Sequence, residues 1–403
     1  MNRREFLEVG ARASLGVMIG SARAARGMAR DRQVATREIQ VVTLEGTARE
    51  RGRMHGEALR AMIRETVEPW RASLSSRKGE SVDQYLVRFA RETSFADAIT
   101  HHTPHLMDEI RGIAEGSGVP FETIFAMQLL DEEWCYATAE QFPESGAGDK
   151  CSVLALARDE HHATIVAQNL DGPDFLDRHI VVLRLKDAKQ DLDALVVTMA
   201  GCIALNGMNA RGLAVCVNAL LTLKNARSGL PVACVIRGVL ERKTLAEAAQ
   251  FVQKVPHASG QCYTIGDVTQ VECHEASAGK VTRALADSQA IAHTNHPLVN
   301  DNVSPLGKWV AMQPADAMPG MHNSRARLEA CQARLASPGA DAIASVKAAL
   351  GSHDRPRDPV CRHLSPGSSF TAACTVYELH AGHPTLHLAT TPPCRGEFRE
   401  HSL

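Results

Sequence analysis

The sequence predicts a layered α+β protein, and two changes of pattern along its 403 residues carry that prediction. Residues from about 45 to 140 repeat apolar side chains every three or four positions, as helices do. From Cys151 onward, short runs rich in valine, isoleucine, leucine and alanine follow one another about every ten residues. No helical pattern separates the first of these runs, which favours antiparallel meanders over parallel β–α–β units.

The helical part comes first. The expected helices are Ala58–Leu74, Leu106–Gly116 and Pro120–Trp134. Each shows an apolar stripe at three- and four-residue spacing, such as Leu59, Ile63 and Trp70. Small and polar residues, Pro143–Lys150, then predict a loop that ends this part of the chain.

Strands dominate the remainder, with helices returning twice. The first strands are expected at Cys151–Ala157, Thr164–Asn169, Ile180–Leu185, Ala194–Thr198, Ile203–Met208 and Leu213–Asn218. Helices follow at Val232–Glu241 and Thr244–Val255, and then strands at Gln261–Ile265, Val271–Glu275 and Ala290–His293. Helices at Ser324–Leu335 and Ala340–Leu350 precede the last strands, Thr371–Glu378 and Thr385–Thr390. This alternation of blocks is typical of an α+β protein.

Composition and charge exclude two classes of partner. Lys and Arg number 44 against 46 Asp and Glu, a net charge of −2, and no basic stripe is present. Nucleic acid and anionic membrane surfaces therefore have no electrostatic basis for binding. No uncharged apolar run reaches the length of a membrane-spanning helix, which excludes an integral membrane protein.

The N-terminus predicts export. Arg3-Arg4 precedes Phe6-Leu7, a modest apolar stretch runs over Val9–Ile19, and Ala22-Arg23-Ala24 suits a cleavage site. Residues 1–24 are therefore predicted to be a bacterial twin-arginine signal, with the mature chain periplasmic or secreted. An ordinary amphipathic N-terminal helix is the alternative.

Neither a metal nor a cofactor is predicted. The 11 cysteines include no C-x-x-C pair, and the 18 histidines form no H-E-x-x-H spacing. The glycines between strands, such as Gly207 and Gly212, are interpreted as hairpin turns because no phosphate-loop lysine or helix follows. In an exported protein Cys361 and Cys374 could form a disulfide, and the sequence leaves this open.

Six segments carry a resemblance to a known family. They are Gly46–Gly56, Ile113–Pro120, the pair Ala167–Asp171 and Asn206–Ala214, His293–His296, Ser324 with its following arginines, and Cys361–His363. In this order they resemble the penicillin acyltransferase family of N-terminal nucleophile hydrolases, the isopenicillin N acyltransferase group of cysteine autopeptidases. The resemblance covers most of the mature chain.

The resemblance implies a four-layer αββα fold with two stacked, mainly antiparallel sheets. It also implies a precursor that cuts its own backbone before a cysteine. Here the cut would fall between Lys150 and Cys151, giving an alpha chain of residues 25–150 and a beta chain of residues 151–403. Lys150 departs from the family, in which glycine is common before the cysteine. The new α-amine, with a reference pKa of about 7.7–8.0, could then take the proton of the Cys151 thiol.

The remaining site residues are implied by position. Asp171, with possible support from Asn169, resembles the acidic residue that orients the new α-amine. Asn295 matches the amide that donates to the oxyanion of the tetrahedral intermediate. Ser324-Arg325 matches the family's serine–arginine pair, and Arg327 is a competing register.

The implied activity is cleavage of a linear amide bond in an N-acyl or peptide-like small molecule, through a thioester on Cys151. The alternatives are an acyl-CoA-dependent acyltransferase and a non-catalytic binding protein that keeps the scaffold. The partners expected are the small-molecule amide and the two chains of one precursor. A homo-oligomer is left open.

Overall fold

The computed structural model describes residues 39–74, 80–138, 151–187, 189, 191–286, 288–313, 319–336, 341–365 and 369–403. Ile39–Leu403 forms one compact unit. The predicted export signal, residues 1–24, and Lys150 of the predicted cleavage site lie outside the described residues. No described helix has the length and apolar character needed to span a bilayer.

Two sheets form the centre of this unit. The eight-stranded sheet has the order β1-β4-β5-β6-β7-β8-β9-β10, and the six-stranded sheet has the order β11-β2-β3-β12-β13-β14. The strands are β1 Val41–Glu45, β2 Ser152–Leu156, β3 Thr164–Gly172, β4 Ile180–Asp187, β5 Leu192–Met199, β6 Asn206–Asn209, β7 Ala214–Ala219, β8 Gln261–Gly266, β9 Val271–Ser277, β10 Lys280–Ala284, β11 Ala290–His293, β12 Phe370–Leu379, β13 Thr385–Ala389 and β14 Arg399–Ser402. Neighbouring strands are antiparallel except β1 and β4, which are parallel.

Helices cover both outer faces of the paired sheets. They are α2 Ala48–Ala58, α3 Arg60–Leu74, α4 Val82–Glu92, α5 Phe95–His102, α6 Pro104–Ser117, α7 Phe121–Met127, α8 Leu130–Thr138, α9 Val232–Leu240, α10 Leu245–Lys254, α11 Pro305–Ala311, α12 Pro319–Leu335 and α13 Ala342–Leu350. Two short 3₁₀ helices are η1 Asp174–Leu176 and η3 Pro393–Arg395.

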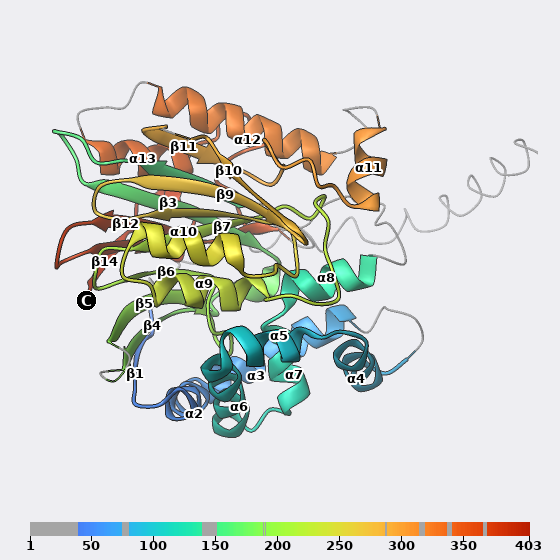
Figure 1. Ribbon diagram of the computed structural model, residues 1–403. Helices are drawn as coiled ribbons and strands as arrows, with labels where there is room; N and C mark the ends of the chain where they lie inside the picture. Colours follow the sequence, from blue (N-terminus) through green and yellow to red (C-terminus); the bar gives the residue numbers. More distant parts are fainter. Residues whose placement is uncertain are drawn as a thin grey trace, which may run out of the picture. The chain divides into compact units, whose positions relative to one another are not determined.

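The elements stack in four layers. α12 and α13 pack on the six-stranded sheet, β2 and β3 of that sheet pack on β7 and β8, and α9 and α10 pack on the other face of the eight-stranded sheet. Figure 1 shows α12 and α13, in orange, at one end of the stack, with α2, α3 and α6 at the other. Every residue of β2 and β3 is buried, as expected for strands covered on both faces. The predicted αββα fold is confirmed.

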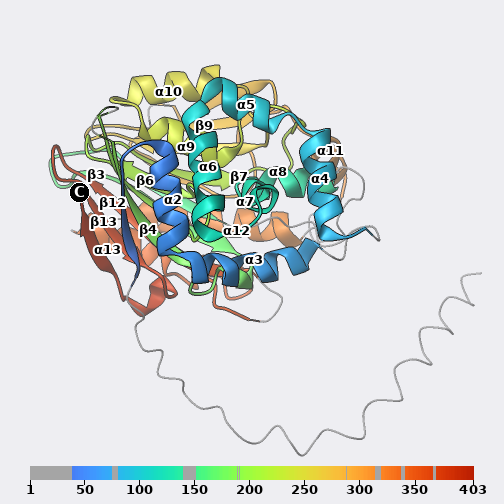
Figure 2. The same ribbon diagram turned by 90° about the horizontal axis from the view of Figure 1, so that it is seen from below.

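Paired glycines allow α2 and α6 to pack closely. Gly52 and Gly56 on α2 face Gly112 and Gly116 on α6, and a β-carbon at any of them would overlap backbone of the opposite helix. Figure 2 shows the two helices side by side. The glycine spacing that carried part of the family resemblance therefore has a packing reason, because only hydrogen side chains allow so close an approach.

Gly52→Ala is expected to destabilise the protein by about 1–3 kcal/mol or more, because the added methyl meets the rigid backbone of Glu109 and cannot be relieved by a rotamer change. Urea unfolding followed by circular dichroism measures the change. Glu57→Ala, on the exposed side of the same helix, is the control and should stay within about 0.5 kcal/mol of the parent. Equal stability of the two variants would contradict the close-packed crossing.

A buried charge cluster fastens this helical layer to the sheet. Arg51 contacts Asp187 at 2.9 Å and Glu109 at 3.5 Å, and Arg237 donates to Glu109 at 2.5 and 3.0 Å. Burial alone would raise the pKa of Glu109, but the charge of Arg237 and its hydrogen bond outweigh this effect and lower it. The pairs thus link α2, α6, β4 and α9.

The structure differs from the predicted elements mainly in the N-terminal part. The predicted Ala58–Leu74 helix is preceded by α2, which has its own capping box at Thr47 and Glu50, and α4 and α5 were not predicted. The predicted Pro120–Trp134 helix is interrupted at residues 128–129 and forms α7 and α8. Strand β1 was missed because its five residues alternate only weakly and find their partner far along the chain in β4.

Candidate active site

Cys151 lies immediately before β2, at one end of a central strand of the six-stranded sheet. β11 and β3 flank β2, so the position is enclosed from both sides. The cysteine is only 9% exposed, and its Sγ lies 3.9 Å from the backbone oxygen of Asp171 on β3. The first residue of the predicted beta chain is therefore held by the sheet itself.

Arg327, on α12, is the hub of the contacts around Cys151. Its Nη1 donates to the backbone oxygen of Cys151 at 2.6 Å and to Oγ of Ser152 at 2.9 Å. Its Nη2 donates to Oδ1 of Asn295 at 2.9 Å, and its Nε donates to Oδ1 of Asn323 at 2.8 Å. Burial lowers the pKa of this guanidinium, while the nearby groups of Asp171 and Cys151 oppose the shift. A single buried arginine thus positions the cysteine and the asparagine together.

The structure brings Arg327, and not Arg325, to Cys151. Two residues along a helix rotate a side chain by about 200°, so the two arginines point to different sides of α12. Arg327 is fully buried, whereas Arg325 is exposed and lines a separate cavity. The slight sequence preference for Arg325 over Arg327 is therefore wrong as to which arginine touches the site.

The Asn295 amide is oriented by contacts at both of its ends. Arg327 occupies Oδ1, and Nδ2 donates to the backbone oxygen of Ala219 at 3.1 Å. Its backbone N–H donates to Oγ of Ser324 at 2.9 Å. Because the acceptor end is fixed by a cation, the donor end faces Ala219, which lines the cavity beside Cys151. The role of Asn295 as an oxyanion donor stays a prediction.

Ser324 holds the turn that carries Asn295. Its Oγ also lies 2.8 Å from Nδ1 of His296 and 3.0 Å from Oγ1 of Thr294. Burial, followed by the charges of His293 and Arg325, lowers the pKa of His296 to about 4. Oγ of Ser324 donates to Thr294 and accepts the backbone N–H of Asn295, so the predicted support residue Ser324 contacts the turn rather than Cys151.

The buried pair of His293 and Glu275 lies next to the turn that carries Asn295, and the sequence did not indicate this pairing. Nε2 of His293 lies 3.0 Å from Glu275, and Nδ1 lies 3.2 Å from Oδ1 of Asn218. Burial opposes the charged imidazole, but the hydrogen bond to Glu275 outweighs it and raises the pKa of His293. Glu275 also accepts the backbone N–H groups of Leu298, Val299 and Asn300. These backbone contacts appear only after folding, so no residue spacing could have indicated them.

Asp171 is oriented by strand β12. Oγ1 of Thr371 donates to Oδ1 of Asp171 at 2.7 Å and accepts the backbone N–H of Arg362 at 3.0 Å. A register shift in β12 between residues 371 and 373 lies directly at this contact. Sequence reasoning missed Thr371, because a bulge in a distant strand leaves no local signal.

Asn169 is buried on β3, but its amide anchors another segment. Its Nδ2 donates to the backbone oxygens of Leu350 at 2.8 Å and Val360 at 3.0 Å. Nδ2 of Asn169 therefore anchors the loop that follows α13, and the support of Asp171 by Asn169 stays a prediction.

An apolar cavity of about 240 Å³ opens at Cys151. It runs between the N-terminal helices, the ends of β3 and β7, and α9. Its apolar walls include Trp70, Leu74, Met127, Trp134, Leu170 and Phe175. A thiol at the end of an apolar cavity is the arrangement expected where an acyl chain is presented to a nucleophile.

Acidic residues on α8 give part of this cavity a polar wall. Asp131 and Glu133 line it, and Asp131 accepts from Nε2 of Gln261 at 2.6 Å. Burial raises the pKa of Asp131; burial, with the charge of Asp131 added, raises the pKa of the adjacent Glu132 to about 7. Oγ of Ser259 donates to Glu132 at 2.7 Å. The acidic run was visible in the sequence, but its burial was not.

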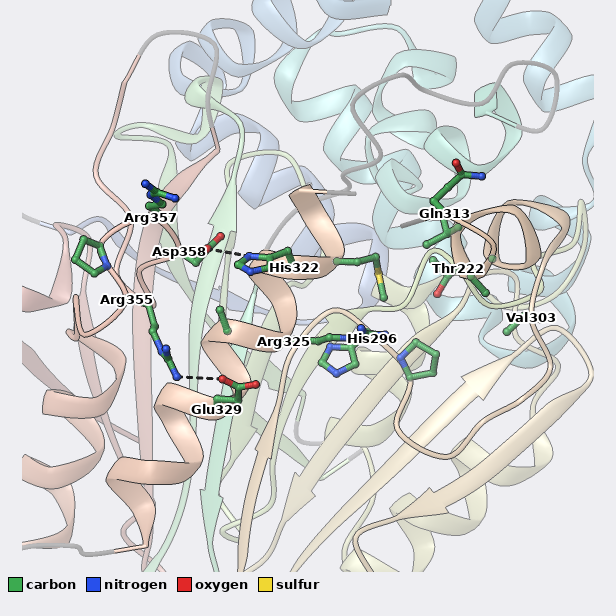
Figure 3. Close-up of a pocket in the computed structure, with 17 residues that line it drawn as sticks. Thr222, His296, Val303, Gln313, His322, Arg325, Glu329, Arg355, Arg357 and Asp358 are labelled. Atoms are coloured by element: carbon green, nitrogen blue, oxygen red, sulfur yellow. Dashed lines mark hydrogen bonds and ion pairs between the residues drawn. The ribbon is translucent and has the colours of Figure 1, made fainter. Parts of the chain in front are cut away.

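A second, larger cavity of about 760 Å³ lies on the side of α12 that carries Arg325 (Figure 3). In Figure 3 Arg325 ends beside His296, while His322 pairs with Asp358 at 3.1 Å and Arg355 pairs with Glu329 at 3.1 Å. Its wall combines apolar residues with three arginines, Arg325, Arg355 and Arg357, and two acidic residues, Glu329 and Asp358.

Comparison with known proteins identifies a family and curated relatives. The sequence profile described as acyl-coenzyme A:6-aminopenicillanic acid acyl-transferase matches residues 158–391. The acyl-coenzyme A:6-aminopenicillanic-acid-acyltransferase 40 kDa form of Emericella nidulans is 26% identical over 266 residues, 65% of this chain and 71% of that protein.

Two solved structures are also similar, at a greater distance. The Caenorhabditis elegans ortholog of N-acylethanolamine-hydrolyzing acid amidase has a TM-score of 0.39 and 16% identity, covering 57% of this chain and 92% of that one. Penicillin V acylase from Agrobacterium tumefaciens has a TM-score of 0.39 and 17% identity, covering 60% of this chain and 84% of that one. At these scores they add nothing to the assignment.

The family match includes Asp171, Asn295 and Arg327 but begins after Cys151. The roles of the individual site residues therefore stay predictions. The match nevertheless spans more than half of the chain, and it agrees with the resemblance that the motifs indicated. This chain belongs to the acyl-coenzyme A:6-aminopenicillanic acid acyl-transferase family.

Proposed function

We propose that this protein is a self-processing cysteine amidase that cleaves the C–N bond of an N-acyl small molecule through a thioester on Cys151. The observation that carries the proposal is the position of Cys151. Its thiol lies at an apolar cavity, and its backbone oxygen is held by the same guanidinium that fixes Asn295. These contacts, which join Cys151, its cavity and Asn295 through one arginine, support the proposal.

Maturation is the first chemical event of the proposal. The Cys151 thiol attacks the carbonyl carbon of Lys150, the Lys150–Cys151 C–N bond breaks, and the nitrogen receives the proton and becomes the free α-amine. Water then hydrolyses the resulting thioester and releases the chain that ends at Lys150. Arg327, donating to the backbone oxygen of Cys151 at 2.6 Å, would keep the cysteine in register with β2 during this exchange.

Turnover repeats the same chemistry on a substrate. The α-amine of Cys151 takes the thiol proton, and the sulfur attacks the amide carbon. Asn295 donates to the oxygen that becomes negative, the amine leaves with a proton, and water hydrolyses the acyl thioester. Asp171, held by Thr371, would keep the α-amine in place.

Hydrolysis is favoured over transfer from acyl-CoA by the proposed export. Acyl-CoA is made in the cytoplasm, whereas a periplasmic or secreted enzyme meets water and extracellular amides. The family description names an acyl-CoA donor and a penicillin nucleus, so transfer between them is the alternative activity. Incubating the mature protein with N-acyl amides, and separately with acyl-CoA and 6-aminopenicillanic acid, distinguishes the two reactions by their products.

Trp134→Ala is expected to change which acyl groups are accepted, because it removes the largest α8 side chain from the cavity wall. We expect kcat/KM for short acyl chains to fall about 10- to 100-fold, while bulky acyl groups lose less or gain. The measurement is a series of N-acyl substrates with one leaving amine.

The matched control for this substitution is Trp309→Ala. Trp309 lies on α11 and does not line the Cys151 cavity. It should leave the acyl-chain preference unchanged. A uniform loss across the whole series in Trp134→Ala would contradict the assignment of this cavity to the acyl group.

A further inference from the structure

A second cluster of reactive side chains lies away from the Cys151 cavity, where the loop after α13 meets η3. It consists of His353, Cys361, His363 and Cys394, and their ligand atoms all lie within 4.8 Å of one another. Nε2 of His363 lies 3.2 Å from Sγ of Cys394, and the rings of His353 and His363 are 5.1 Å apart. Four soft or borderline donors therefore converge on one point.

The donor set matches one metal better than others. Two cysteine sulfurs and two imidazole nitrogens form a common tetrahedral site for structural zinc. Zn–S bonds of about 2.3 Å and Zn–N bonds of about 2.0–2.1 Å place tetrahedral ligands roughly 3.3–3.8 Å apart. Separations of up to 4.8 Å are thus within a small side-chain movement of that geometry.

The backbone already holds the two segments together. The N–H of Cys361 donates to the backbone oxygen of Ser352 at 3.2 Å, which closes the loop. A β-carbon on Gly351 would lie 3.2 Å from the backbone of Cys394, so the end of α13 is packed tightly against η3. Cys361 is buried and the other three ligands are exposed, which gives a metal a path from solvent.

We propose that His353, Cys361, His363 and Cys394 bind one zinc ion, which fastens the loop after α13 to η3. Binding releases the protons of the two thiols and leaves both sulfurs as thiolates. This proposal departs from the sequence prediction that the chain holds no metal. It also gives Cys361 another partner than Cys374, which is buried on β12 and is not bonded to it.

The loop in question reaches the candidate active site. Arg362, between two of the proposed ligands, donates its N–H to the same Thr371 hydroxyl that holds Asp171. The backbone oxygen of Val360 accepts from Asn169. A zinc ion here would therefore be structural and would stabilise the backbone behind Asp171, independently of whether Cys151 is the nucleophile.

The test measures metal content, which does not depend on activity. Reduced full-length protein purified with zinc is expected to contain one zinc ion per chain, as measured by inductively coupled plasma mass spectrometry. Chelator-treated protein titrated with Co²⁺ should develop thiolate-to-cobalt charge-transfer bands that saturate at one equivalent. Removal of the metal should lower Tm, because zinc binds the folded loop only.

Variants assign the ligands. Cys394→Ser and His363→Ala should each lose the zinc and the tetrahedral cobalt spectrum. His383→Ala, an exposed histidine outside the cluster, is the matched control and should keep both. If a ligand variant does not fold, X-ray absorption of the parent protein decides, since two sulfur and two nitrogen ligands are expected.

Three results would overturn the proposal. The first is reduced parent protein that binds neither zinc nor Co²⁺ at one equivalent. The second is zinc that persists unchanged in Cys394→Ser and His363→Ala. The third is a disulfide between Cys361 and Cys394 in parent protein isolated without zinc, as found by peptide mapping. It would overturn the proposal if the same disulfide forms again, after reduction, when zinc is present.

Discussion

Cys151→Ala is expected to accumulate as one uncut chain with no amidase activity. The substitution removes the thiol that lies directly before β2 and lines the apolar cavity. Because the same sulfur performs both self-cleavage and turnover, both should be lost, with kcat/KM reduced at least about 10⁴-fold. Intact mass spectrometry measures the cut, and release of amine from an N-acyl substrate measures the activity.

Two further variants show whether the sulfur itself is required. Cys151→Ser keeps a nucleophilic oxygen and should cut slowly and turn over poorly, since an alcohol is a weaker nucleophile than a thiolate. Cys234→Ala changes a buried cysteine on α9 that does not line the Cys151 cavity; it is the control and should mature normally. If Cys151→Ala still separates into two chains at the same bond, a host protease makes the cut and self-processing is refuted.

Asn295→Ala is expected to lower kcat and kcat/KM together, by about 10²–10³-fold, with little change in KM. Nδ2 of Asn295 donates one proton to the backbone oxygen of Ala219, a residue that lines the cavity, while Oδ1 is held by Arg327. Its second proton is therefore available to an oxygen that becomes negative only in the transition state. Initial rates over a range of substrate concentrations separate the two constants.

The control for this substitution lies in the same region of chain. Asn302 donates to Oγ of Ser277 at 3.0 Å and to the backbone oxygen of Ala278 at 3.1 Å, and it has no contact with Cys151 or Arg327. Asn302→Ala should reduce stability more than turnover. An Asn295→Ala variant that raises KM alone would show instead that Asn295 shapes the binding site without stabilising charge.

The choice between Arg325 and Arg327 shows where sequence reasoning stops. Both arginines fit the family's serine–arginine segment, and the sequence places them on one expected helix. The rotation of α12 against β2 decides which one is buried against Cys151. That rotation is set by the packing of the whole helix, in which Ser324 and Asn323 take up other partners.

The cluster around Cys361 was missed for a related reason. Its four proposed ligands come from the loop after α13 and from η3, and no C-x-x-C or H-x-x-x-H spacing connects them. Zinc sites built from distant segments have no local pattern. The buried acidic residues on α8 were likewise present in the sequence, but only the fold places Asp131 and Glu133 at the cavity wall.

By itself the sequence determined the α+β class, most strands of the second half, the family and the identity of Cys151, Asp171 and Asn295 as candidate residues. These depend on local periodicity and on short motifs, which adjacent residues encode. Tertiary structure alone decided the contacts of Arg327, the support of Asp171 by Thr371 and the convergence of His353 and Cys361 with Cys394. Such contacts join residues far apart in the chain, and the packing of sheets and helices, not sequence spacing, fixes which of them meet.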